Sequence, residues 1–137
     1  MPKYFTVEEA NRTLPLVRRI VEDIVKTYEE LTERVAEARQ TSPGGGDEAE
    51  TPPELEAEIR ELTDRTNGYI AELDELSALF KGPEEGLVDF YAMLDERPVF
   101  LCWKLGEEQI EYWHELEAGY AGRQRLPAHL LSAGGAE

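Results

Sequence analysis

The chain of 137 residues contains 30 acidic and 14 basic residues, which gives a formal net charge of −16. Such a charge repels phosphate backbones and anionic lipid surfaces, because both are bound mainly through Lys and Arg side chains. We therefore expect neither a nucleic-acid partner nor a membrane partner. At this length the chain is expected to form a single domain.

Cys102 is the only cysteine, which excludes an internal disulfide and a metal cluster built from thiolates of one chain. It lies in the apolar run Val99–Trp103, which predicts a buried thiol that packs as a small hydrophobic side chain. The N-terminal residues lack the apolar stretch of a signal peptide, and no apolar run reaches the about 18 residues that span a bilayer. These features predict a cytoplasmic protein.

The first predicted helix begins at Thr6, because Thr6-Val-Glu-Glu9 matches a capping box. Apolar residues then recur at alternating spacings of three and four over residues 7–35, the pattern of a helix packed lengthwise on another helix. Pro15 interrupts this pattern, since proline inside a helix removes a hydrogen bond and clashes with the preceding turn. We expect a short helix that ends near Thr13 and a long one that begins at Leu14, rather than one kinked helix.

Residues 41–50 are rich in glycine and predict a mobile loop. Thr51-Pro-Pro-Glu54 then resembles a second capping box, with a proline at the first helical position. A second apolar seam runs from Leu55 to Phe80, and Gly82-Pro83 is expected to end this helix. Since the loop is short, the two helices should form a long, antiparallel, coiled-coil-like hairpin over residues 6–81.

Beyond Gly86 the spacing of apolar residues changes to that of strands. Residues 87–93 and 98–105 are rich in aromatic and branched side chains, and residues 94–97 between them can turn, so a β-hairpin is predicted. Residues 110–116 fit either a third strand or a short helix, and we favour the strand.

The predicted fold class is α+β, mainly α, with a small antiparallel β-meander over residues 87–126 packed at the base of the helical hairpin. The apolar face of the hairpin is wider near that base, which calls for a second layer of cover there. Residues 1–126 are expected to form one domain, and residues 127–137 a loosely ordered tail.

Several groups of residues carry a resemblance to a known family: Tyr4-Phe-Thr-Val-Glu-Glu-Ala-Asn11 with Leu14-Pro15, Leu87-Val-Asp-Phe90, Leu101-Cys-Trp-Lys-Leu-Gly-Glu107, and Trp113-His-Glu-Leu116 with Gly119-Tyr-Ala-Gly-Arg123. Together they resemble the bacterial family catalogued as domain of unknown function 2203. The resemblance covers nearly the whole chain, apart from the glycine-rich loop and the tail. It implies that these segments form one domain, and it brings no activity and no binding residues with it.

His114, with Glu111 and Glu115, is the most suggestive cluster for metal binding. A zincin helix would need a second histidine at position 118, which is Ala118. Glu111 and His114 match half of a di-iron carboxylate motif, which needs two such pairs on helices. Three alternatives remain: a divalent metal bound by His114, Glu111 and Glu115, general acid–base chemistry, or a half-buried histidine hydrogen-bonded to a carboxylate or carbonyl group. We favour the last.

Arg123 follows the glycine-bounded residues 119–122 and is the best candidate for binding a small anion, because arginine offers a planar fork of donors. No phosphate-binding glycine motif accompanies it, so a structural arginine that binds loop carbonyls or Glu115 is favoured. Trp103 and Trp113 are expected to be cross-strand neighbours in the core or at an interface.

The sequence favours a non-enzymatic interaction or structural protein that forms a homodimer through its helical hairpin. The distal half of the hairpin, with Tyr28, Leu31 and Val35 opposite Leu55, Ile59 and Leu62, has no cover left in the chain. Pairing two hairpins into a four-helix bundle is a common solution, and a different protein partner is the other. The alternative function is a metal- or small-anion-binding protein, with or without enzymatic activity, around His114.

Overall fold

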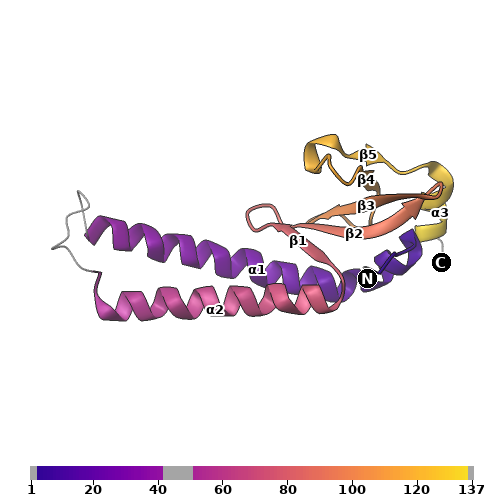
Figure 1. Ribbon diagram of the computed structural model, residues 1–137. Coiled ribbons are helices and arrows are strands. Elements are labelled where there is room, and N and C mark those ends of the chain that lie inside the picture. Colours follow the sequence, from indigo (N-terminus) through magenta and orange to yellow (C-terminus); the bar gives the residue numbers. More distant parts are fainter. Residues whose placement is uncertain (1–2, 42–50, 136–137) are drawn as a thin grey trace.

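The computed structural model describes residues 3–41 and 51–135 and has an α+β architecture that is mainly helical. Two long helices form an extended hairpin, and a five-stranded sheet packs across one end of it (Figure 1). The glycine-rich loop predicted over residues 41–50 lies outside the described residues, apart from Thr41 at the end of the first helix. No described helix combines the length and the apolar character that crossing a membrane requires.

Helix α1 spans Val7–Thr41, and the predicted capping box holds its first turn. The Thr6 amide donates to the Glu9 carboxylate and the Glu9 amide donates to the Thr6 hydroxyl, both at 3.0 Å. The first of the two predicted capping boxes is thus confirmed.

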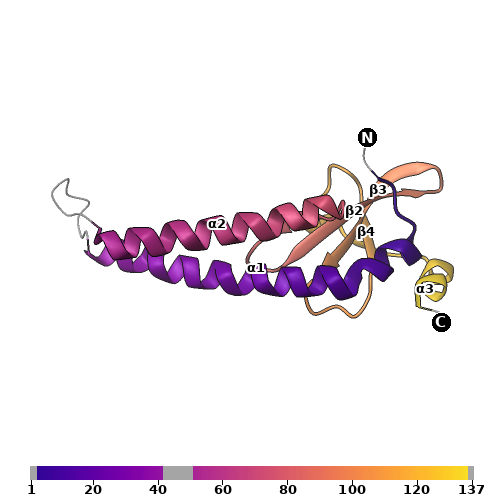
Figure 2. The same cartoon turned by 90° about the horizontal axis from the view of Figure 1, so that it is seen from below.

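The expected break at Pro15 is wrong, because α1 continues through this proline as one helix. Pro15 itself is exposed, while Leu14 and Val17 beside it are buried in the core and keep the segment helical. The N-terminal end of α1 departs from the line of the rest (Figure 2), as expected of a helix that contains a proline.

Helix α2 spans Pro53–Glu75 and lies antiparallel to α1 (Figure 1). Proline occupies its first helical position as predicted, but the second capping box is wrong: Pro52 is the N-cap residue and no side chain caps the helix. The helix also ends seven residues before the predicted stop at Gly82.

A Schellman motif ends α2. The amides of Ser77 and Ala78 donate to the carbonyls of Asp74 and Leu73, at 2.9 and 3.0 Å. Ser77 adopts a left-handed φ of 62°, a position that glycine usually fills. The chain then leaves the helix axis, so Phe80, which belonged to the predicted seam, lies in the first strand instead.

The sheet is an antiparallel meander whose strands neighbour one another in chain order. Its strands are β1 Leu79–Gly82, β2 Leu87–Leu94, β3 Arg97–Lys104, β4 Tyr112–His114 and β5 Gln124–Arg125. The predicted hairpin is confirmed, and Asp95 and Glu96 close it with φ of 53° and 64°, as a type I′ turn requires. The strand that we favoured within residues 110–116 is present as β4.

One face of the sheet packs on the helices and supplies most of the core. Its buried residues alternate along the strands and contact the buried face of α1: Val88, Phe90 and Ala92 of β2, and Val99, Leu101 and Trp103 of β3. Trp113 also points to this face and pairs with Leu101, so Trp103 is its diagonal neighbour on the adjacent strand, and both tryptophans are buried in the core.

The expected loose tail contains helix α3, Ala128–Gly135. Leu130 and Leu131 pack against the core, and the Leu130 amide donates to the Pro127 carbonyl at 3.0 Å. The N-terminal segment lies nearby as an extra edge, where the Phe5 amide donates to the Tyr91 carbonyl at 2.7 Å. Both ends of the described chain therefore add to the sheet end of the molecule.

The seam between α1 and α2 is buried to different degrees along its length. Val21 and Ile24, near the sheet, are fully buried. Tyr28, Leu31 and Val35, farther along α1, remain partly exposed. The distal half of the hairpin thus lacks the second layer that the sheet gives to the base.

Candidate functional site

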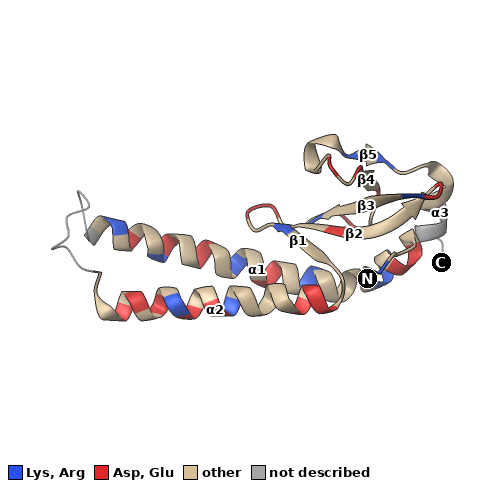
Figure 3. Cartoon of the chain, in the orientation of Figure 1, with Lys and Arg blue, Asp and Glu red and all other residues tan. Residues whose placement is uncertain are grey.

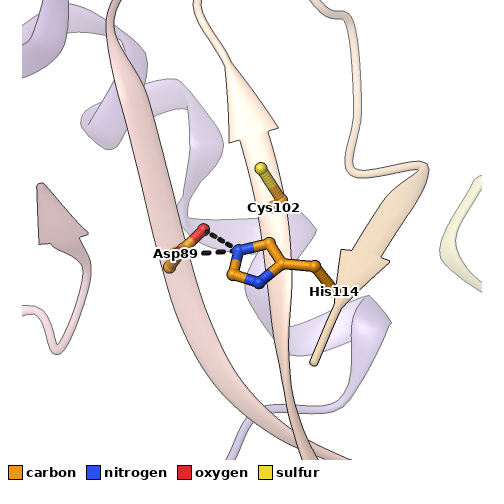
Figure 4. A group of neighbouring side chains, drawn as sticks. All are labelled: Asp89, Cys102 and His114. Carbon is orange, nitrogen blue, oxygen red and sulfur yellow. Dashed lines mark hydrogen bonds and ion pairs between the residues drawn. The ribbon is translucent and has the colours of Figure 1, made fainter. Parts of the chain in front are cut away.

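Three side chains that can hold a metal ion meet on the face of the sheet opposite to the helices. Asp89 comes from β2, Cys102 from β3 and His114 from β4 (Figure 4). Asp89 lies directly opposite Cys102, which pairs with Tyr112, and His114 is two residues farther along β4 on the same face. One ligand atom of each lies within 4.8 Å of the others, and all three residues are buried.

The hydrogen bonds of His114 determine where its protons are. Its Nδ1 is 2.7 Å from the Glu115 carbonyl oxygen, which can only accept, so Nδ1 carries a proton. Its Nε2 is 3.1 Å from both carboxylate oxygens of Asp89. A bare imidazole nitrogen and a carboxylate are both acceptors, so this contact contains one proton shared between His114 and Asp89.

Burial raises the pKa of the other two groups, Asp89 and Cys102. The pKa of Asp89 is raised because burial penalises the carboxylate, although the charges of His114 and Lys81 act in the opposite direction. Burial and the nearby Asp89 raise the pKa of Cys102 from 9.0 to about 12. The Arg123 guanidinium, whose Nη1 is 3.9 Å from Sγ, opposes this shift without cancelling it. Near neutral pH Cys102 is therefore a thiol, as the sequence predicted.

A pocket of about 440 Å³ opens directly over the three side chains. Besides the cluster, its lining includes Lys81 and Phe100 of the sheet and residues 116–120, which cross the outer face after β4. The Lys81 ammonium is 4.9 Å from the centre of the Phe100 ring, which is 5.4 Å from the centre of the His114 ring. The cluster is thus buried but reachable from one side.

The carboxylates of Glu111 and Glu115 are not brought to His114. Glu115 pairs with Arg97 at 3.1 Å and Glu111 with Arg125 at 3.5 Å. Both residues flank β4, which spans Tyr112–His114, and their side chains turn to these arginines rather than to the imidazole. Glu115 contributes only its backbone carbonyl, and among the described residues Asp89 and Cys102 take the place predicted for the two glutamates.

Arg123, the predicted anion-binding residue, forms an ion pair within the chain. Its guanidinium binds both carboxylate oxygens of Glu107, at 3.3 and 2.8 Å. It also lies 3.9 Å from the centre of the Tyr112 ring and 4.6 Å from that of Tyr120. This is the structural arginine that the sequence favoured, with Glu107 rather than Glu115 as its partner.

Comparison with known proteins gives one match. Residues 3–126 match the family described as "Uncharacterized conserved protein (DUF2203)". No curated protein and no solved structure matches the chain. The match includes Asp89, Cys102 and His114.

Proposed function

We propose that this chain, which belongs to the uncharacterized conserved family DUF2203, is a metal-binding protein whose ligands are Asp89, Cys102 and His114. The observation that carries the proposal is the convergence of three different donors at one buried point. Tetrahedral ligand atoms 2.0–2.3 Å from Zn²⁺ lie roughly 3.3–3.8 Å apart. The carboxylate and imidazole donors are already 3.1 Å apart, and the thiol is within 4.8 Å of both.

The donor set favours Zn²⁺ among divalent ions. A thiolate and an imidazole are ligands that Zn²⁺ prefers, whereas Mg²⁺ and Ca²⁺ prefer an all-oxygen site. One carboxylate and one thiolate also neutralise the two charges of the ion, which makes the complex tolerable in a buried place. With three protein ligands, the fourth tetrahedral position is left to the pocket, the arrangement of zinc sites that act on a substrate or bind a ligand.

The second contact of His114 supports the same proposal. Histidines that bind metals usually donate their other ring N–H to a carboxylate or a carbonyl, which fixes the ring and directs the free nitrogen at the ion. The bond from Nδ1 to the Glu115 carbonyl does this and leaves Nε2 facing Asp89. The Arg123 guanidinium next to Sγ favours the thiolate that metal binding requires.

Metal analysis of the full chain, purified without chelator and without affinity tag, tests the proposal. One zinc ion per chain is expected after incubation with Zn²⁺ and gel filtration. His114→Ala should lose the ion, whereas His129→Ala, which removes the exposed histidine of α3, should retain it. Because His114→Ala also leaves buried partners unpaired, Cys102→Ser serves as a milder second variant that should lower the affinity for Zn²⁺. A folded, unmodified chain that retains no ion would overturn the proposal.

Self-association through the hairpin is a second candidate function, favoured by the partly exposed seam of the distal half. Tyr28, Leu31 and Ile70 line a groove of about 330 Å³ along the hairpin, and Phe80 and Pro83 also line it. A second hairpin is the simplest apolar cover for such a face, and twofold dimers are the commonest oligomers. Acidic residues are spread along both helices, however, with fewer Lys and Arg residues between them (Figure 3), and this excess of negative charge opposes the pairing of two identical hairpins.

A further inference from the structure

We infer that the pocket over Asp89, Cys102 and His114 binds a small carboxylate with an apolar body, whose oxygen fills the open metal position and whose charge is balanced by Lys81. The inference rests on the proposed metal site and names the class of ligand that this site takes. Three features of the pocket carry it: its position, its charge and its walls.

The pocket lies where a ligand could reach the metal ion. The same pocket is lined by all three proposed ligands, so its inner end is the place where a fourth donor atom would reach the ion. At about 440 Å³ it falls within the range of small-molecule sites, which is roughly 300–1,000 Å³. A ligand that coordinates the ion therefore has room for further groups.

The charge of the pocket selects a single negative charge. The ion with one carboxylate, one thiolate and a neutral imidazole has no net charge, so the side chains around it decide which ligands enter. Lys81 is exposed on β1 and reaches over Phe100 towards the cluster, whereas Arg123 is already paired with Glu107. Glu117 also lines the pocket and disfavours a second negative charge. A monoanion fits this balance better than phosphate or a dicarboxylate.

The walls of the pocket favour an apolar body. Phe100 forms part of the floor beside His114, and Leu87, Leu116 and Tyr120 complete the apolar lining. Leu116 and Tyr120 are large side chains that are 41% and 39% exposed, so an apolar ligand resting on them removes further apolar surface from water. An aromatic monocarboxylate satisfies both the walls and the charge.

Cobalt substitution of the full chain gives a direct test, since Co²⁺ replaces Zn²⁺ and its visible absorption changes when a ligand enters. The cobalt protein is titrated with benzoate, acetate, succinate and inorganic phosphate. Benzoate should change the spectrum at the lowest concentration and phosphate at the highest. Lys81→Gln should weaken benzoate binding by about tenfold, because it removes the pairing charge. Lys26→Gln, an equal loss of charge on the exposed side of α1, should leave benzoate binding unchanged.

The outcomes separate this inference from the metal site itself. A cobalt spectrum that no carboxylate alters overturns the inference and leaves the metal site standing. Benzoate binding that is equally strong in Lys81→Gln overturns it as well, as does a preference for phosphate. A chain that takes up no cobalt overturns the metal site and the inference together.

Discussion

His114 and Asp89 share one proton in the 3.1 Å contact between the imidazole Nε2 and the carboxylate. Binding of a metal ion must displace this proton and the proton of the Cys102 thiol, so two protons should leave for each ion near neutral pH. The apparent affinity for Zn²⁺ should then rise by about 100-fold per pH unit. Chelator competition at several pH values measures this slope. In Cys102→Ser the thiol proton is absent, so the affinity for Zn²⁺ should rise by only about tenfold per pH unit. An affinity that does not change with pH would contradict the assignment of these protons.

Cys102 also predicts how the folded chain responds to alkali. Its pKa rises from 9.0 to about 12 on folding, so the folded state keeps the thiol proton that the unfolded state has already lost. The contribution of this group to stability is complete below about pH 9 and declines as the pH rises from there towards 12. Denaturant unfolding of the metal-free chain should show this decline, and Cys102→Ala should show less of it. Equal declines in both proteins would mean that other groups cause it.

At the scale of elements, the sequence predicted the end of α2 at Gly82, whereas the helix ends at Glu75. The Schellman motif has Ser77 at the position that glycine usually occupies, so its left-handed φ of 62° carries a steric cost. Ser77→Gly should relieve this cost and stabilise the fold by up to about 1 kcal/mol, net of the greater freedom of glycine in the unfolded chain. Ser77→Ala keeps the Cβ atom and should bring no such gain. Thermal melts of the three proteins decide between these outcomes.

The predictions that held were those set by local chemistry and by periodicity. The capping box at Thr6 needs only residues within one turn, and the seam of α1 needs only a regular spacing. The break at Pro15 was wrong because core packing on both sides outweighed the proline. The helix of residues 128–135 was missed because its cover comes from distant parts of the chain.

The candidate site needed a register that periodicity alone does not supply. Asp89 and Cys102 are 13 residues apart, and they face each other only because the two-residue turn at Asp95 and Glu96 sets the pairing of β2 with β3. The sequence contained this signal, since strands 87–93 and 98–105 were predicted with a turn between them. Glu111 and Glu115 were chosen for closeness in sequence, but a strand separates such neighbours and joins residues across the sheet.

At the scale of the whole molecule, the partly exposed face of the distal hairpin leads us to expect that dimer formation depends on salt concentration. If two copies pair through this face, their combined acidic charge opposes the dimer, so added salt should strengthen it by screening the repulsion. Sedimentation equilibrium at low and high salt measures this trend. A single species of 15.5 kDa up to about 100 μM in about 150 mM salt would contradict the dimer, because exposed charges are then largely screened. Leu31→Glu, in the exposed groove, should dissociate the dimer.

The length of the hairpin is independent of the geometry of the candidate metal site. Helix α1 has 35 residues and so is about 50 Å long, while the sheet covers only its base and carries the site on its far face. Since the seam repeats every seven residues, adding or removing seven residues in both helices keeps the same faces in contact. Each such step moves the tip of the arm by about 10 Å and leaves Asp89, Cys102 and His114 where they are. The length of the hairpin can therefore change in evolution without changing what the sheet binds.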